Sequence, residues 1–98
     1  MKVFWTHMAY RRLEEIFSYI EKDSPNNARR WVDKLVKKVT QLKDLPKVGR
    51  VVSEGGSANI REIIYGNYRI IYKVKDDAIY VLTVRHFKQI LPIKEIEE

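Results

Sequence analysis

The sequence has no cysteine and only two histidines, four glycines and three prolines among its 98 residues. Without cysteine, the chain has no disulfide, no thiol nucleophile and no cysteine ligand for zinc or an iron–sulfur cluster. His7 and His86 alone are too few for a multi-histidine metal site. We therefore expect no metal and no cofactor. The lack of cysteine is compatible with a reducing cytoplasm.

Long apolar runs are also absent. No stretch approaches the roughly 20 residues that a membrane-spanning helix needs. The first six residues, MKVFWT, do not begin the apolar run of a signal peptide, and no small-residue cleavage site follows them. The sequence therefore predicts a cytoplasmic protein without a membrane partner, and its length fits one domain with a modest core.

Positive charge is in excess and unevenly placed. The chain carries +6, but residues 92–98 carry −2, so residues 1–91 carry +8 from 18 basic and 10 acidic side chains. Residues 29–50 alone hold eight basic and two acidic side chains. Such a bias indicates an anionic partner, either nucleic acid or an acidic protein. The alternative is a solvated helix face that keeps the protein soluble.

The first half of the chain predicts a short strand and two helices. Lys2 to Trp5 suits a half-buried strand, and Thr6 follows as a helix N-cap. Ser24-Pro25 is a strong start signal for a second helix, whose apolar stripe runs from Ala28 to Leu42 and which ends before Pro46. Apolar residues at helical spacing mark the first helix: Ala9, Leu13, Ile16, Phe17 and Ile20. The short link between the helices predicts an antiparallel hairpin.

Three strand-like runs follow, over residues 60–65, 68–75 and 78–86. Gly66-Asn67 and Asp76-Asp77 separate them, and both pairs suit tight hairpin turns. The expected fold class is α+β, a small single domain of order β-α-α-β-β-β with a helical hairpin packed on an antiparallel sheet. We expect the domain to cover residues 1–91 and residues 92–98 to form a short acidic tail.

Tight turns also predict which side chains share a face of the sheet. Alternation places Arg85 on the face that packs against the helices. It places His86 on the opposite face, beside Glu62 and Arg69. That second face is either a smaller packing surface or a binding surface, and a slip of one residue would exchange the two faces.

The common catalytic motifs are absent, including GxGxxG, the phosphate-binding loop, HExxH and GxSxG. Arg69 and His86 would still suit ribonuclease chemistry, in which an arginine stabilises the phosphorane and an acid protonates the leaving oxygen. The alternative is structural, with Arg69 paired to Glu62 and His86 making a hydrogen bond at a strand end. Arg61 and Arg85 could simply flank the core with their charged ends in water.

An ordered set of residues resembles the RelE/ParE superfamily of toxins from type II toxin–antitoxin modules. The resemblance spans residues 1 to about 91 and rests on Trp5-Thr6, Ser24-Pro25, Leu45-Pro46, Gly49-Arg50-Val51-Val52, Ile60-Arg61-Glu62-Ile63, Tyr68-Arg69-Ile70-Ile71-Tyr72 and Val84-Arg85-His86. It implies a cognate antitoxin partner that covers the toxin with its C-terminal segment. An acidic antitoxin segment would explain the basic body as well as nucleic acid does, and the surface that receives it is not assigned by the sequence.

The superfamily has two branches, which differ in target. RelE-like members cut mRNA in the ribosome without a metal, whereas ParE-like members poison DNA gyrase. In the ribonuclease branch the resemblance puts catalytic roles on Arg69, His86 and Glu54. The tyrosine that such enzymes carry near the last strand is missing, because Phe87 stands there. The resemblance therefore favours the ParE-like branch, with Arg61, Arg85 and Lys88 as the residues expected to contact the target or another anion.

The sequence thus predicts an antitoxin-neutralised toxin that inhibits growth by poisoning gyrase and is not an enzyme. The first alternative is a ribosome-dependent, metal-independent mRNA endoribonuclease. The second is a non-toxic relative that binds an antitoxin or RNA.

Overall fold

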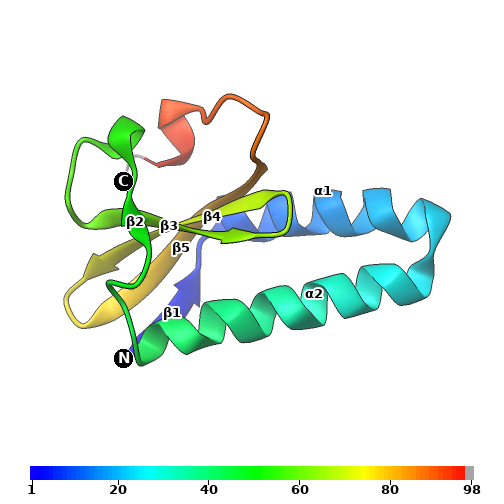
Figure 1. The fold of residues 1–98 in the computed structure, drawn as a ribbon, viewed down its shortest axis with the longest axis horizontal. Coiled ribbons are helices and arrows are strands. Elements are labelled where there is room, and N and C mark those ends of the chain that lie inside the picture. Colours follow the sequence, from blue (N-terminus) through cyan, green and yellow to red (C-terminus); the bar gives the residue numbers. More distant parts are fainter. Residues whose placement is uncertain (97–98) are drawn as a thin grey trace.

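The computed structural model describes residues 1–96 and has two layers (Figure 1). A helical hairpin lies on one side of a sheet, and the loop after β2 and the C-terminal segment lie on the other. The main elements are β1 (Lys2–Trp5), α1 (His7–Asp23), α2 (Pro25–Thr40), β2 (Arg50–Val51), β3 (Ile60–Tyr65), β4 (Tyr68–Lys75) and β5 (Ala78–His86). Short 3-10 turns cover Gln41–Lys43, Ser53–Gly55 and Ile93–Glu95.

The two helices begin at the predicted capping residues. The Thr6 hydroxyl accepts a hydrogen bond from the Ala9 amide at 3.1 Å, and the Ser24 hydroxyl accepts one from the Asn27 amide at 3.2 Å. Each bond satisfies an amide that the first helical turn leaves without a partner. Pro25 occupies the first turn of α2, where no backbone donor is needed. The sequence signals for both helix starts are confirmed.

The sheet has the strand order β1-β5-β4-β3-β2. The β3–β4 and β4–β5 hairpins are antiparallel, as expected, and both turns lie where the sequence predicts them. Asp76 and Asp77 adopt positive φ angles of 52° and 59°, the conformation that a tight hairpin turn requires. β1 pairs with β5 in parallel, so the sheet is mixed rather than purely antiparallel. The α+β fold class is confirmed.

One register shift interrupts the β4–β5 pairing and overturns a predicted face. Tyr72 pairs with Val81, but Ile71 pairs with Thr83, so Leu82 is an extra residue in β5. Such a bulge moves every later side chain to the other face of the sheet. Beyond it, Arg85 lies on the face away from the helices and His86 on the helical side, which reverses the expected placement of both.

The bulge coincides with the point where α1 starts. The Thr6 hydroxyl donates to the Val81 and Leu82 carbonyls at 2.9 and 3.1 Å, and the Thr6 amide donates to Val81 at 3.1 Å. These bonds use carbonyl oxygens of β5 that lie beyond the reach of β1, because β1 ends at Trp5. The start of α1 is thereby attached to the irregular part of β5.

Two apolar clusters lie on opposite faces of the sheet. The larger lies beneath the helices and includes Ala9, Leu35, Val39, Leu42, Ile70, Tyr72, Ile79, Val81 and Val84. The smaller lies on the other face and includes Val52, Ile60, Ile71, Leu82, Leu91 and Ile96. The second face is therefore a packing surface, covered by the loop after β2 and by the segment that follows β5.

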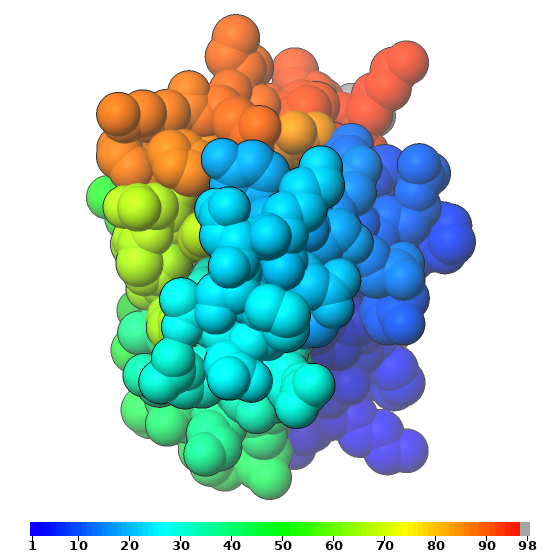
Figure 2. Space-filling model, turned by 90° about the vertical axis from the view of Figure 1, so that its right-hand side faces the viewer, coloured from blue at the N-terminus to red at the C-terminus, as the bar shows by residue number. Residues whose placement is uncertain are grey.

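The expected acidic tail, as far as the structure describes it, packs on the molecule. Leu91 and Ile96 are buried in the smaller cluster, and the Glu95 side chain between them is also buried. Residues 97–98 of the tail lie outside the described residues. Figure 2 shows the orange-to-red C-terminal segment running along one end of the molecule beside the blue start of α1.

Candidate functional site

The face of the sheet away from the helices carries two buried carboxylates, each held by arginines. Arg69 in β4 lies directly opposite Arg85 in β5. Two like charges this close need counterions, because their repulsion is only weakly screened in a partly buried site. Glu62 supplies one for Arg69, and Glu95 supplies one for Arg85.

The Glu62 cluster lies at the β2 side of the sheet. Arg69 donates two hydrogen bonds to Glu62, at 3.1 and 2.6 Å, and Arg50 donates two, at 3.2 and 2.9 Å. Arg69 also reaches Glu54 at 3.3 and 3.4 Å. Burial alone would raise the pKa of Glu62, but the bonds from Arg69 and Arg50 outweigh it and hold the pKa below its ordinary value. Glu62 is therefore ionised at neutral pH.

The Glu95 cluster lies at the α1 side. Arg12 of α1 donates to Glu95 at 3.4 and 2.7 Å, Arg85 donates through Nε at 3.0 Å and also through Nη2, and the Thr83 hydroxyl donates at 2.5 Å. Burial by itself would raise the pKa of Glu95, but the bonds from Arg85, Arg12 and Thr83 lower it from its ordinary value of 4.5 to about 2. Two arginine forks and a hydroxyl thus surround one carboxylate.

His86 lies apart from the predicted catalytic arginine. Its ring packs edge-on against Tyr68, with centroids 5.6 Å apart, and stacks on Phe87 at 5.0 Å. Its Nδ1 accepts a hydrogen bond from the Lys88 amide at 3.2 Å. Because His86 is on the helical side of the sheet and Arg69 on the other, the structure does not bring these two residues together.

The other predicted site residues are also dispersed. Arg61 donates hydrogen bonds to the Lys47 carbonyl at 3.3 Å and the Gly49 carbonyl at 2.8 Å, so it supports the loop before β2. Lys88 lies beside the Phe87 ring, with its ammonium 5.8 Å from the centroid. Among the predicted residues, Glu54 and Arg69 join their side chains in an ion pair, whereas the bond between Lys88 and His86 uses the Lys88 backbone.

Sequence reasoning missed the contributions of Arg12, Thr83 and Glu95. Arg12 falls off the apolar stripe of α1 and reads as a solvated charge, whereas Glu95 reads as one acid of a charged tail. The bulge at Leu82 is what turns Thr83 toward the second face. No local pattern in the sequence predicts that bulge, because β5 is apolar on both faces.

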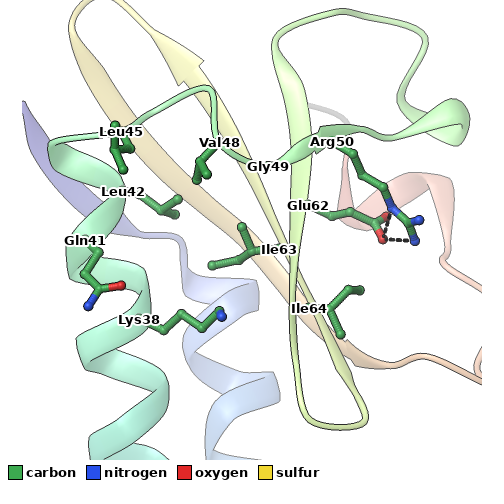
Figure 3. A pocket seen from close by; sticks show the side chains of 10 residues that line it. All are labelled: Lys38, Gln41, Leu42, Leu45, Val48, Gly49, Arg50, Glu62, Ile63 and Ile64. Carbon is green, nitrogen blue, oxygen red and sulfur yellow. Dashed lines mark hydrogen bonds and ion pairs between the residues drawn. The ribbon is translucent and has the colours of Figure 1, made fainter.

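An open groove lies on the helical side, beside the end of α2 (Figure 3). It has a volume of about 390 Å³, and Leu42, Leu45 and Val48 face Ile63 across it. Leu45 and Val48 are each 62% exposed, which is unusual for apolar side chains gathered in one place. The remaining lining residues are Lys38, Gln41, Gly49, Arg50, Glu62 and Ile64.

A second, more polar hollow of about 610 Å³ separates α1 from the ends of β4 and β5. Tyr19, Tyr68 and His86 contribute rings to its wall, and Arg12 and Arg85 reach it from the Glu95 cluster. Within residues 1–96, no three side chains of the metal-binding types gather at one point, and no helix is long and apolar enough to cross a membrane.

Residues 3–91 match the family described as the ParE toxin of the type II toxin–antitoxin system parDE. A relative from Sinorhizobium fredii, named "Putative toxin Y4kP", is 38% identical over 93 residues, which is 93% of each chain. The fold is similar to a solved chain of the chromosomal ParDE system of P. aeruginosa, with a TM-score of 0.73 and 21% identity, over 88% of this chain and 95% of that one.

The fold and these matches define a toxin component of a type II toxin–antitoxin system. The chain belongs to the ParE toxin family.

Proposed function

We propose that this toxin inhibits growth by binding DNA gyrase, and that a cognate antitoxin neutralises it. Family membership supports both partners, and the positive charge of residues 1–91 suits an acidic antitoxin segment. We also propose that the toxin acts in the cytoplasm, where it would meet both proposed partners. Arg61, Arg85 and Lys88 are cations that we propose contact gyrase or another anionic surface.

The observation that carries the choice of binding over RNA cleavage is the separation of His86 from the other two candidate catalytic residues, Arg69 and Glu54. Arg69 and Glu54 are engaged with each other, and Arg69 also holds the buried Glu62. His86 lies across the sheet from them. A ribonuclease needs its acid, base and arginine around one phosphate, within hydrogen-bond reach of the reacting atoms. This arrangement favours a toxin that acts by occupying its target.

The experiment compares the two targets with one protein preparation. We expect the purified toxin to inhibit supercoiling of relaxed plasmid by gyrase and to leave mRNA intact in a translating extract. Arg69→Ala and His86→Ala serve as a matched pair: the mRNA of the extract should stay intact with either variant, as it does with the unchanged toxin. Ribosome-dependent cleavage that both substitutions abolish, with normal supercoiling, would establish the ribonuclease alternative and end this proposal. No growth defect on expression without antitoxin would favour a non-toxic relative.

We propose further that the antitoxin binds the groove of Figure 3. Its apolar wall is open to solvent, and basic side chains lie at its rim, among them Lys38 and Arg50. β2 covers β3 only as far as Glu62, so within residues 1–96 the outer edge of Ile64 has no strand partner. An extended antitoxin segment with alternating apolar and acidic residues would fit all three features: an apolar wall, a basic rim and a free strand edge.

A charge introduced into the groove tests this placement. Val48→Asp puts a charge into the apolar wall, and it should weaken binding of the cognate antitoxin by about 100-fold or more. Ile93→Asp is the control, because Ile93 is 60% exposed and lies on the other face. If calorimetry gave the two variants equal affinity for the antitoxin, the antitoxin would bind elsewhere on the toxin. The gyrase proposal would not be affected by that result.

A further inference from the structure

The Glu95 cluster has the composition of a binding site whose ligand is part of the same chain. The receiving side chains come from two rigid elements, α1 and β5, whereas the carboxylate comes from a single 3-10 turn after β5. Two guanidinium forks and one hydroxyl on a buried carboxylate are the donor set that proteins use to recognise a carboxylate ligand. The side chains that receive the carboxylate therefore belong to elements other than the segment that fills the site.

The segment that carries Glu95 has few other polar attachments. Its own backbone bonds are internal: the Glu95 amide donates to the Pro92 carbonyl, and the Ile96 amide donates to the Ile93 carbonyl. Among the described residues, the Glu95 carboxylate makes every hydrogen bond that joins 90–96 to the rest of the molecule. Ile90 is 89% exposed and Ile93 is 60% exposed, so half of its apolar side chains are not packed.

The contacts on either side of Glu95 define what else could occupy the place. Leu91 and Ile96 fill apolar positions against Leu82 and Ile71 in the smaller cluster. A nucleic-acid phosphate would satisfy the arginines but would leave these apolar positions open to water. A peptide with an acidic residue between apolar ones satisfies both, at about 25 cal/mol for each Å² of apolar surface that it covers.

We propose that Arg12, Thr83 and Arg85, with the apolar surface around Leu82, form a peptide-binding site that the chain's own 91–96 segment fills and that an acidic–apolar peptide of a partner protein fills when this segment is displaced. The exchange replaces one carboxylate by another, so the buried arginines keep a counterion throughout. The attached segment competes at a high effective concentration, and an external peptide must offer more contacts than the segment does.

The test uses the full chain and a labelled synthetic peptide with the sequence of residues 90–96. Glu95→Lys places a third cation beside Arg12 and Arg85 and expels the segment, so fluorescence polarisation should show this variant binding the peptide at least about tenfold more tightly than the unchanged chain does. The factor follows if the segment fills its site in nine-tenths of the molecules or more. Glu21→Lys makes the same charge change on the exposed end of α1 and should not increase binding.

Three further measurements distinguish the proposal from general electrostatic attraction. A peptide with the glutamate replaced by glutamine should lose at least about tenfold in affinity. Arg85→Gln added to Glu95→Lys should remove the gain. Circular dichroism verifies folding, and Glu95→Gln serves if Glu95→Lys does not fold. Equal binding of the two peptides, no gain in a folded Glu95 variant, or displacement of the peptide by an equal concentration of single-stranded RNA would each overturn the peptide site.

Discussion

Glu62 and Glu95 occupy the same face of one sheet and have the same chemistry, but the chain holds them in different ways. Each is a buried carboxylate between two arginines. Glu62 belongs to β3, where its backbone pairs with Ile71 on one side and Arg50 on the other. Glu95 belongs to a short turn whose backbone, within residues 1–96, makes only internal bonds.

The difference teaches that an ion pair alone does not reveal whether a carboxylate is structural or replaceable. To remove Glu62 from its arginines, the sheet itself must open, because the ladder on both sides holds the residue in place. To remove Glu95, only the turn has to leave. We therefore expect equivalent substitutions at the two sites to have unequal effects.

Glu62→Ala should be the most damaging of these substitutions. It leaves the largely buried Arg69 guanidinium with only the longer contacts to Glu54, and the sheet prevents water from replacing the lost partner freely. Loss of one partner from a buried pair costs about 3 kcal/mol or more. Urea unfolding should show this decrease. A loss below about 1 kcal/mol would mean that Glu62 is as replaceable as Glu95.

Glu95→Ala should cost less, about 1–2 kcal/mol, because the segment detaches and water then reaches Arg12 and Arg85. Hydrogen exchange should show residues 91–96 losing protection while β4 and β5 keep theirs. Loss of protection throughout the sheet would contradict the idea that this segment is a separable ligand.

Acid should release the segment while it weakens the sheet. The pKa of Glu95 is lowered to about 2, so its stabilising contribution is complete above the ordinary value of 4.5 and is lost as the pH falls toward 2. The stability difference between the unchanged chain and Glu95→Gln should therefore be constant above about pH 5 and shrink below it. The pKa of Glu62 is also lowered, so Glu62→Gln supplies the matched titration.

Glu54→Gln should have the smallest effect, below about 0.5 kcal/mol. Its contacts with Arg69 are long, and its side chain is 40% exposed, so solvent screens the pair. Thermal unfolding measures the difference. A larger loss would place Glu54 inside the Glu62 cluster as an essential member rather than at its margin.

Much of the fold could be predicted from local signals. Ser24-Pro25 marked the start of α2, and Gly66-Asn67 and Asp76-Asp77 marked the hairpin turns, because capping and positive φ angles demand particular residues. The parallel pairing of β1 with β5 could not be predicted so directly. This pairing joins the two ends of the domain, and no hairpin turn connects the two strands and indicates that they pair.

The candidate site was less accessible to prediction because it depends on register. The pairing of Arg69 with Glu62, one of two interpretations offered by the sequence, is confirmed. The prediction that Arg69 and His86 lie side by side is wrong, because the alternation of side chains between the two faces of β5 is interrupted at Leu82. A strand that is apolar on both faces gives no sign of where an extra residue falls.

That extra residue has a consequence for how such a toxin diversifies. If Leu82 took a regular place opposite Ile71, the bulge would close, His86 would move to the arginine face and Arg85 would turn toward the helices, with every charged residue retained. One change of register in β5 could therefore interchange two surfaces that substitution would have to rebuild residue by residue. Relatives with nearly the same composition could then present different chemistry to the same target.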